Sequence, residues 1–316
     1  MKKPFSNFLK MKHKYSITIL FVVICILLPA SGHSGSRTVI DQLGRKVVLS
    51  DNPIRIVSLA PNITEIVFAL GQEHRLIGVT RFSDFPPEAK QIPGVGSYVN
   101  LDLEKIVFLK PDLCIATKDG NPREVASSLE SLQIPVYAVD PRNLDSVMDT
   151  IDEMGRLLNV TEKAGELVAS MRSRIACVDS LVSKTDHRPR VFFQIGVSPI
   201  VSVGTDTYIH ELIVRAGGEN LAAGHASYPR FSREQVLALS PDIFIITSMA
   251  RERVFEKVKA EWSRWSDLPA VRDNRIILVD SNILDRPTPR MVDGLELLAQ
   301  VIHPELFATK AKEPKQ

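Results

Sequence analysis

The stretch LEKIVFLKPDL, residues 103–113, returns 130 positions later as REQVLALSPDI, residues 233–243. Each copy predicts a short helix that ends at a Pro-Asp turn, because a proline disfavours helical backbone in the residue before it. Asp102 and Ser232 precede the copies as candidate N-caps. Glu104 and Glu234 therefore stand at equivalent positions near the two helix starts. A repeat of this length indicates two lobes built alike rather than a solenoid.

Apolar, β-branched runs of strand length surround both copies, and helical or turn-rich segments separate them. This alternation is typical of a parallel α/β sheet. The predicted strands are residues 55–60, 76–80, 113–117 and 136–140 in the first lobe, and 191–195, 243–247 and 276–279 in the second.

Between the lobes, apolar residues recur at helical spacing and no strand is expected. A helix over residues 161–184 would be ~36 Å long, enough to bridge two lobes as a rigid strut. The predicted fold class is therefore α/β, with two Rossmann-like lobes joined by a long rigid α-helix. Its ligand cleft is expected between the lobes, where small ligands usually bind.

The expected organisation has five parts. Residues 1–32 form a signal peptide, and residues 33–141 form an N-terminal α/β lobe that opens with a hairpin at 38–49. Residues 142–187 form the helical connector, residues 188–308 the C-terminal α/β lobe, and residues 309–316 a polar tail.

The N-terminus has the pattern of a secretory signal. Five lysines precede a charge-free run at residues 17–28, which is shorter than the ~20 residues of a spanning helix. Ala30-Ser31-Gly32 fits a signal-peptidase site, so we expect cleavage after Gly32 and a periplasmic product. A bulky Ile24 before Cys25 argues against a lipid anchor. Cleavage leaves 39 − 5 = 34 basic residues against 37 acidic ones, a net charge of −3, which disfavours nucleic acid as a partner.

Catalytic and metal-binding patterns are missing from the sequence. The histidines form no H-x-H, H-E-x-x-H or i, i+4 pair, so we expect no metal site. Cys114 and Cys177 are interpreted as two buried free thiols, although the sequence does not show whether they pair. The alternative of a different class is a secreted α/β hydrolase, which would need a G-x-S-x-G nucleophile. Residues 196–200, GVSPI, lack the second glycine, so we expect no enzyme and no catalytic residue.

Several ordered motifs resemble one family. They are RIVSLAPNITE at 55–65, GVTRFSDFPPEA at 78–89, residues 100–112, GGEN at 217–220 and residues 232–242. Over residues 38–307 the chain is similar to the periplasmic cobalamin-binding proteins of ABC importers, within the helical-backbone family whose members also take haem, iron-siderophores and metals. The FSDFPPEA and GNP stretches indicate the corrinoid subgroup.

The resemblance implies a set of site residues. Phe82, Tyr98 and Tyr228 match aromatic wall positions of the family, and Arg286 matches a polar position on the opposite lobe. Core packing is the alternative for Phe82 and Tyr98, and a surface ion pair with Asp285 or Asp280 is the alternative for Arg286. Thr117 and Ile195 stand where family members can have aromatic groups, which implies a less aromatic pocket.

The resemblance also implies a function without chemistry. The protein would capture cobalamin or a related corrinoid as its transported ligand, with no cofactor, and deliver it to an ABC importer permease dimer. Glu104 and Glu234 would dock a monomer on that dimer by facing its arginines. Placement against the helix dipole is the alternative explanation for both glutamates. Capture of haem or an iron-siderophore is the alternative function.

Overall fold

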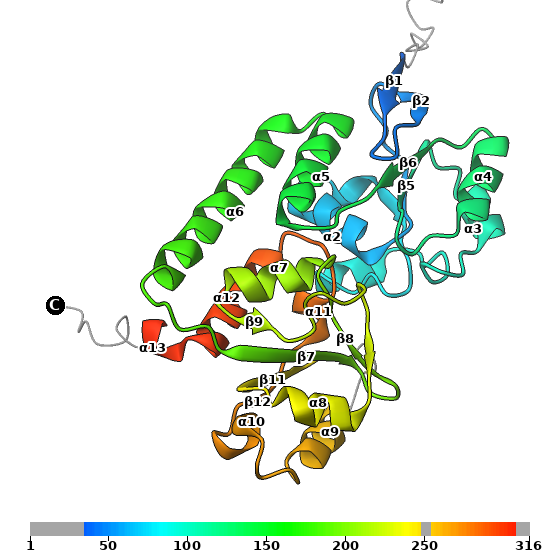
Figure 1. The fold of residues 1–316 in the computed structure, drawn as a ribbon. Coiled ribbons are helices and arrows are strands. Elements are labelled where there is room, and N and C mark those ends of the chain that lie inside the picture. The colour runs from blue at the N-terminus through cyan, green and yellow to red at the C-terminus, as the bar shows by residue number, and fades with distance from the viewer. Residues whose placement is uncertain (1–34, 248–253, 308–316) are drawn as a thin grey trace, which may run out of the picture. The chain divides into compact units, whose positions relative to one another are not determined.

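The computed structural model of the chain describes residues 35–247 and 254–307, and Figure 1 shows how their elements are arranged. No helix within these residues combines the length and the apolar run needed to cross a membrane. The expected signal peptide and the expected polar tail lie outside the described residues.

The first lobe is built on a parallel four-stranded sheet in the order β4-β3-β5-β6. Its central strands are buried along their whole length, as expected for parallel strands covered on both faces. A two-stranded hairpin precedes the sheet and turns at Gly44, whose φ is +76°. The elements are β1 Ser36–Ile40, β2 Lys46–Ser50, β3 Ile56–Ser58, α2 Pro61–Ala69, η1 Glu73–Arg75, β4 Leu76–Gly78, η2 Pro87–Gln91, α3 Leu103–Phe108, β5 Leu113–Thr117, α4 Arg123–Ser131 and β6 Val136–Val139.

The second lobe repeats the parallel order as β9-β7-β11-β12 and adds two strands, of which β8 pairs antiparallel with β7 and β10 pairs antiparallel with β8. Helices and short connecting segments make up the rest of this lobe. The elements are β7 Arg190–Gly196, β8 Ile200–Ser202, α7 Tyr208–Arg215, β9 Glu219–Asn220, β10 Arg230–Phe231, α8 Arg233–Leu239, β11 Ile243–Ile246, α9 Val254–Trp262, α10 Pro269–Arg272, β12 Ile276–Leu278, α11 Ser281–Leu284, α12 Met291–Ile302 and α13 Pro304–Phe307.

The repeated segments have the same local structure in both lobes. Lys110 and Ser240 follow helices α3 and α8 with φ of 50° and 47°, which ends each helix in a left-handed residue. The carboxylate of Asp112 then accepts backbone N–H groups at the start of β3, from Ile54 at 2.8 Å and Arg55 at 2.9 Å. Asp242 accepts the N–H of Arg190 at the start of β7, at 2.9 Å. The Pro-Asp turn thus joins the helix to the neighbouring strand in both lobes.

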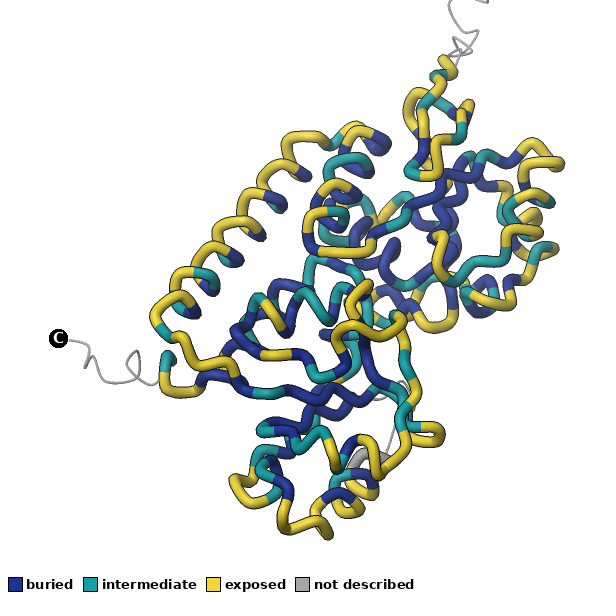
Figure 2. Tube along the Cα trace, in the orientation of Figure 1, coloured by how far each residue is buried: buried dark blue, intermediate teal, exposed yellow. Residues whose placement is uncertain are grey.

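Two helices connect the lobes. α5 (Leu144–Leu157) begins at a capping box formed by Asn143 and Ser146, and α6 (Thr161–Val182) packs on α5, α7 and α12. The buried residues of α6 recur every three or four positions and therefore lie on one side of the helix. In Figure 2 this side is dark blue and faces the lobes. One hydrophobic core runs from Ile115 through α5 and α6 to Ile245 and Leu295. The connector is therefore packed against both lobes along its length, as a rigid strut requires.

Two sequence expectations need revision. Cys177 is exposed on α6, whereas Cys114 is buried in β5 and both thiols are free. The interpretation of two buried thiols was therefore wrong for Cys177, which occupies the solvent side of the helix next to the buried Val178. The antiparallel strands β8 and β10 were not expected, because runs of two and three residues give no periodicity to recognise.

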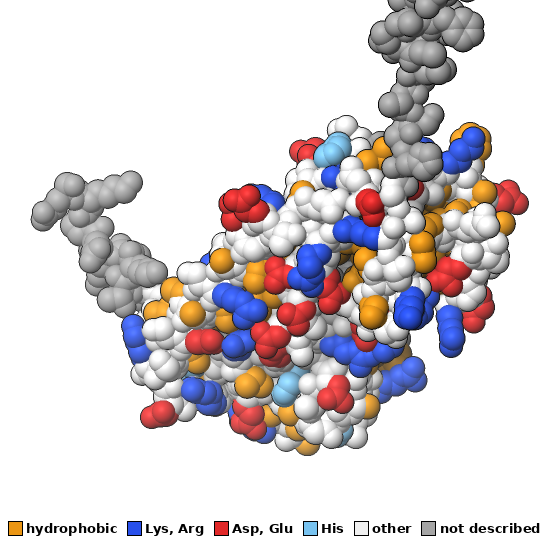
Figure 3. All heavy atoms as spheres, turned by 90° about the horizontal axis from the view of Figure 1, so that it is seen from above, with side chains coloured by type: hydrophobic (Ala, Val, Ile, Leu, Met, Phe, Trp, Pro, Cys, Tyr) orange, Lys and Arg blue, Asp and Glu red, His pale blue; other side chains and the backbone are white. Residues whose placement is uncertain are grey.

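Charged side chains of both signs are interspersed over the face that Figure 3 shows. This face of the molecule presents mixed charge rather than a continuous basic field of the kind that polyanions bind.

Candidate functional site

A cleft of about 1150 Å³ is the candidate site, and both lobes contribute to its lining. This volume exceeds the range of about 300 to 1,000 Å³ that is usual for small-molecule sites, so the cleft suits a large ligand. The lining residues are Ala60, Pro61, Asn62, Phe82, Tyr98, Thr117, Asp119, Asp140, Pro141, Arg142, Asn143, Thr205, Asp206, Thr207, Tyr208, Glu211, Ser227, Tyr228, Ser281, Asn282, Asp285, Arg286 and Pro287.

The three aromatic residues expected in the wall all lie on this lining. Phe82 and Tyr98 come from loops of the first lobe and pack edge to face, with ring centroids 6.1 Å apart. Tyr228 comes from the loop before β10 in the second lobe and is 57% exposed. Phe82 is 37% exposed and Tyr98 is half-buried. The first lobe therefore offers a pair of rings and the second lobe a single ring.

The loop that carries Tyr98 is held in place by the Gly-Asn-Pro stretch at residues 120–122. Asn121 donates its amide hydrogens to the carbonyls of Leu59 and Tyr98, both at 2.8 Å, and accepts the N–H of Thr117. Gly120 has a φ of +131°, and a Cβ there would come within 2.9 Å of the Tyr98 ring. The glycine is needed both for this backbone conformation and for the close approach of the ring.

Arg286 lines the cleft but bonds across it to the first lobe. Its Nη1 donates to Glu65 at 3.1 Å and to Asp84 at 3.0 Å, and its Nη2 donates to the carbonyl of Phe82 at 3.1 Å. The alternative of a surface ion pair with Asp285 or Asp280 was therefore wrong, because Arg286 pairs with two other acids. The reason is that the side chain reaches acids of the opposite lobe, more than 200 residues away in sequence.

Acidic groups outnumber basic groups on the lining. Five carboxyl side chains line the cleft, and its two arginines, Arg142 and Arg286, already bond to acids. The Nε of Arg142 donates to Asp140 at 3.0 Å, and Lys118 also donates to Asp140 at 3.0 Å. The polar part of the cleft is therefore rich in hydrogen-bond acceptors.

Two carboxyls, one from each lobe, differ in their acidity. Burial alone would raise the pKa of Asp140, but its bonds to Arg142 and Lys118 outweigh burial and hold that pKa below its ordinary value. Burial raises the pKa of Asp285 to about 7, although Thr247 donates to it at 3.3 Å and Arg286 is near. Asp285 therefore changes charge near neutral pH inside the cleft.

Glu104 and Glu234 are exposed on α3 and α8 and are not part of the cleft lining. Each follows an N-cap whose side chain accepts a backbone N–H, from Lys105 to Asp102 at 2.9 Å and from Gln235 to Ser232 at 3.2 Å. Hydrogen bonds at this helix start, from its own backbone and then from Ser232, lower the pKa of Glu234. Both side chains are therefore available at matching positions of the two lobes.

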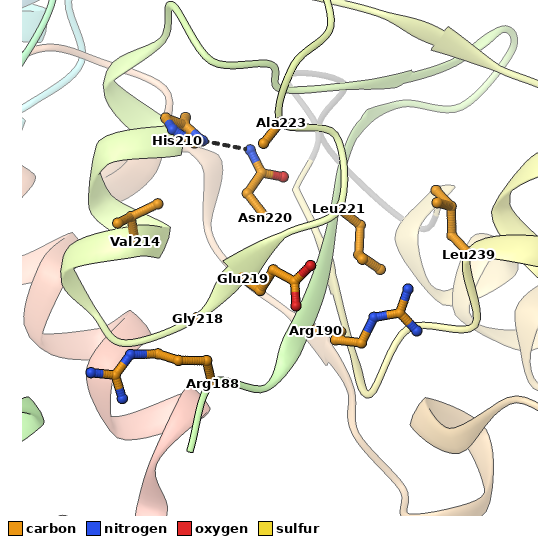
Figure 4. A pocket seen from close by; sticks show the side chains of 10 residues that line it. All are labelled: Arg188, Arg190, His210, Val214, Gly218, Glu219, Asn220, Leu221, Ala223 and Leu239. Atoms are coloured by element: carbon orange, nitrogen blue, oxygen red, sulfur yellow. Dashed lines mark hydrogen bonds between the residues drawn. The ribbon is translucent and has the colours of Figure 1, made fainter. Parts of the chain in front are cut away.

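A second, smaller pocket of about 570 Å³ lies on the C-terminal lobe around β9, and Figure 4 shows its lining. Arg188 and Arg190 extend in opposite directions there, while Asn220 turns toward His210. Asn220 donates to the carbonyl of Val203 at 2.8 Å and bonds to His210 at 3.0 Å. The polar groups serve the fold and do not converge on one point, so the cleft between the lobes is the stronger candidate site.

Sequence reasoning missed Glu65, Asp84 and Arg290, which join the two lobes beside Arg286. The one available signal was a glutamate as the single charged residue of the helix at 61–69. Of the two positions noted as less aromatic, Thr117 lies on the lining. Ile195 instead packs, half-buried, against the hydrophobic core.

A wide cleft between two like lobes, with a long helix packed against both, defines a two-lobed ligand-binding protein. The profile of the periplasmic binding protein family matches residues 56–283. The chain belongs to the periplasmic binding protein family.

Relatives agree with this assignment. The vitamin B12-binding protein of Vibrio parahaemolyticus serotype O3:K6 is 30% identical over 252 residues, which are 79% of this chain and 90% of that protein. The ABC transporter substrate-binding lipoprotein YvrC of Bacillus subtilis is 31% identical and covers 85% of this chain and 86% of its own length. The structure of the periplasmic heme-binding protein RhuT from Roseiflexus sp. RS-1 is 28% identical. Its TM-score is 0.72, over 80% of this chain and 98% of that chain. These matches confirm the expected fold class and family.

Proposed function

We propose that this protein captures cobalamin or a related corrinoid in the cleft between its lobes and delivers it to the permease of an ABC importer. Family membership, the name of the Vibrio relative and the size of the cleft support this function. The transported corrinoid is the ligand, and the protein contributes no chemistry of its own.

The charge of the cleft lining is the observation that carries the choice of ligand. A corrin ring has a fringe of primary amides, which donate hydrogen bonds to carboxylates and accept them from a protonated acid such as Asp285. Haem instead carries two anionic propionates, which need cations with free donors. Asp140 and Glu211 are themselves paired to cations, but Asp119, Asp206 and Asp285 add further acids to the lining, and both of its arginines already bond to acids. The lining therefore favours an amide-fringed ligand.

The shape of the lining supports the same choice. A flat ring can pack against Phe82 and Tyr98 on one lobe and against Tyr228 on the other, because aromatic faces bind broad apolar plates well. Arg286 lies on the lining beside Phe82 and donates to the carbonyl of that residue at 3.1 Å. We assign Phe82, Tyr98, Tyr228 and Arg286 as the ligand-binding residues.

Haem or an iron-siderophore is the second candidate ligand, and of these the similarity to RhuT, a heme-binding protein, favours haem. The test is to incubate the purified protein in parallel with cobalamin, haem and a ferric siderophore, and to record absorption spectra after desalting. We expect the corrinoid spectrum to be retained at one equivalent per chain. Retention of haem alone, or of the siderophore alone, would replace the corrinoid by that ligand.

Docking on the permease is assigned to Glu104 and Glu234. A two-fold symmetric permease presents each surface patch twice, so a monomer with duplicated lobes can meet it with two matched contacts. Carboxylates exposed at equivalent helix starts suit arginines of such a partner. The similarity to YvrC, a substrate-binding protein of an ABC transporter, supports a partner of this kind.

Residues 1–32 are assigned as a cleavable signal peptide, so that the protein acts in the periplasm. Support comes from the charge-free run and the small residues at 30–32, and from the periplasmic family. N-terminal sequencing of the exported protein should begin near His33. A lipid on Cys25, or retention of the apolar run, would contradict this assignment.

A further inference from the structure

A cluster of four charged side chains joins the lobes at one side of the cleft. Glu65 is at its centre, with only 3% of its side chain exposed. Arg290 bonds to it through two nitrogens, Nε to Oε2 and Nη2 to Oε1, both at 2.8 Å. Arg286 adds a third bond to Glu65 at 3.1 Å and a bond to Asp84 at 3.0 Å. Two arginines and two acids therefore balance one another in a mostly buried place.

Every charge pair in this cluster crosses from one lobe to the other. Glu65 lies in α2 and Asp84 in the loop after β4, both in the first lobe. Arg286 and Arg290 lie between α11 and the start of α12, in the second lobe. Arg290 also stacks on the ring of Phe85, with its guanidinium carbon 3.7 Å from the ring centroid. The segment 286–290 is thus fastened to the loop 82–85.

The cluster also holds part of the proposed ligand wall. The Nη2 of Arg286 donates to the carbonyl of Phe82 at 3.1 Å, which ties the backbone of this aromatic residue to the opposite lobe. Glu65 in turn fixes the guanidinium of Arg286 by accepting from its Nη1. A two-nitrogen bond between arginine and carboxylate is directional as well as strong. Glu65 therefore reaches the cleft indirectly, through Arg286.

We infer that Glu65 is a positioning residue that sets the separation of the lobes, and with it the thickness of ligand that the cleft holds. The inference deepens the proposed function and rests on it, since the ligand is taken to be a plate held between walls from both lobes. Glu65 itself does not line the cleft. Loosening the cluster should let the lobes separate further and release the ligand sooner.

The test uses the mature protein with Glu65→Gln, which keeps the shape of the side chain and removes its charge. Asp41→Asn is the matched control. Asp41 is a buried carboxylate that Arg45 also binds through two nitrogens, at 2.8 and 2.7 Å, but both residues belong to the hairpin of the first lobe. Spin labels at Ser127→Cys on α4 and Ala238→Cys on α8 report the distance between the lobes. The background carries Cys177→Ser, because that native thiol is exposed.

In the ligand-free protein, Glu65→Gln should broaden the distribution of label distances, whereas Asp41→Asn should leave it as narrow as in the parent. Dissociation of cyanocobalamin, measured by chasing labelled ligand with unlabelled ligand, should become about tenfold faster in Glu65→Gln, because lobes that are less firmly joined open the cleft more often and affinity changes appear mostly in the off-rate. A role confined to stability would lower the melting temperature without changing either measurement.

Arg290→Lys is the second variant and keeps the test decisive if Glu65→Gln does not fold. A lysine retains the charge but cannot form the two-nitrogen bond, so we expect an intermediate broadening and an intermediate off-rate. Parental distances and parental off-rates in the variants that fold would overturn the inference. If the parent binds no cobalamin, the proposed function fails, and the label distances still decide whether the cluster sets the separation of the lobes.

Discussion

The two lobes share one frame and differ in the loops that line the cleft. Asp112 and Asp242 make the same turn in both, and the parallel strands have the same order. The first lobe adds the loops of Phe82 and Tyr98, whereas the second adds the antiparallel strands β8 and β10 and the loop of Tyr228. Duplication thus accounts for the matched helices α3 and α8. The proposed ligand contacts come from segments that are not repeated, as is common for binding loops on a rigid frame.

The largest effect should come from reversing the charge of the two proposed docking residues on helices α3 and α8. We expect Glu104→Arg combined with Glu234→Arg to abolish uptake, because both carboxylates would be replaced by charges that repel the arginines of the partner. Each single change should reduce uptake less than the double change. The measurement is uptake of labelled cobalamin by cells that carry only the variant protein. Ligand affinity in solution should not change, and uptake at the parental rate by the double variant would contradict the assignment.

The acids of the two lobes should respond differently to pH. Because burial raises the pKa of Asp285 to about 7, the folded protein binds a proton there that the unfolded chain has released above about pH 4. This group therefore lowers stability as pH rises from about 4 to about 7. Between pH 5 and pH 8 it should remove roughly 2 to 3 kcal/mol from the unfolding free energy.

Asp285→Asn should lose that part of the pH dependence, as measured by urea unfolding at both pH values. Asp140→Asn should remove a pH dependence of the opposite sign, because the ionised form of Asp140 contributes stability. Bonds from Arg142 and Lys118 keep the pKa of Asp140 below its ordinary value despite burial, so its contribution is lost only as pH falls through that lower pKa. Identical pH profiles for the parent and Asp285→Asn would mean that Asp285 has an ordinary acidity.

The proposed walls can be weighed against each other by truncation. Phe82→Ala, Tyr98→Ala and Tyr228→Ala should each weaken affinity by about 1 to 3 kcal/mol through lost apolar contact. Titration calorimetry measures this, and thermal unfolding serves as the control. Tyr228→Ala should leave stability nearly unchanged, since its side chain is 57% exposed. Normal affinity in all three variants would place the ligand elsewhere.

The smallest effect should distinguish the two Pro-Asp turns. Asp112→Ala removes two hydrogen bonds from backbone N–H groups and should cost about 1 to 2 kcal/mol of stability, whereas Asp242→Ala removes one and should cost about 1 kcal/mol. Urea unfolding measures both. A larger loss for Asp242→Ala would contradict the expectation that the loss of stability follows the number of hydrogen bonds removed.

Most of the frame could be predicted from the sequence, because buried parallel strands read as apolar runs and helices end at glycine and proline signals. The strand at 113–117 has the predicted bounds, and the long helix ends at Val182, two residues before the predicted end. Strands β8 and β10 were missed because pairing across a sheet stabilises them, and their own two- and three-residue sequences carry no pattern. Cys177 is exposed because it lies on the side of α6 that the lobes do not cover, and the sequence alone does not show which side they cover.

The site could be predicted only in part. The aromatic residues came from resemblance, and each falls in a loop whose direction is set by distant bonds such as those of Asn121. The partners of Arg286 could not be read from the sequence, because Glu65 is 221 positions away and only the packing of the lobes brings them together.

The central claim is that one amide-fringed, apolar plate binds between the lobes. Its most direct test is a calorimetric titration of the mature protein with cyanocobalamin at several temperatures. The account predicts one ligand per chain and a negative heat capacity change, because the aromatic walls bury apolar surface. Absence of binding to cyanocobalamin, together with a stoichiometric titration by haem, would contradict it.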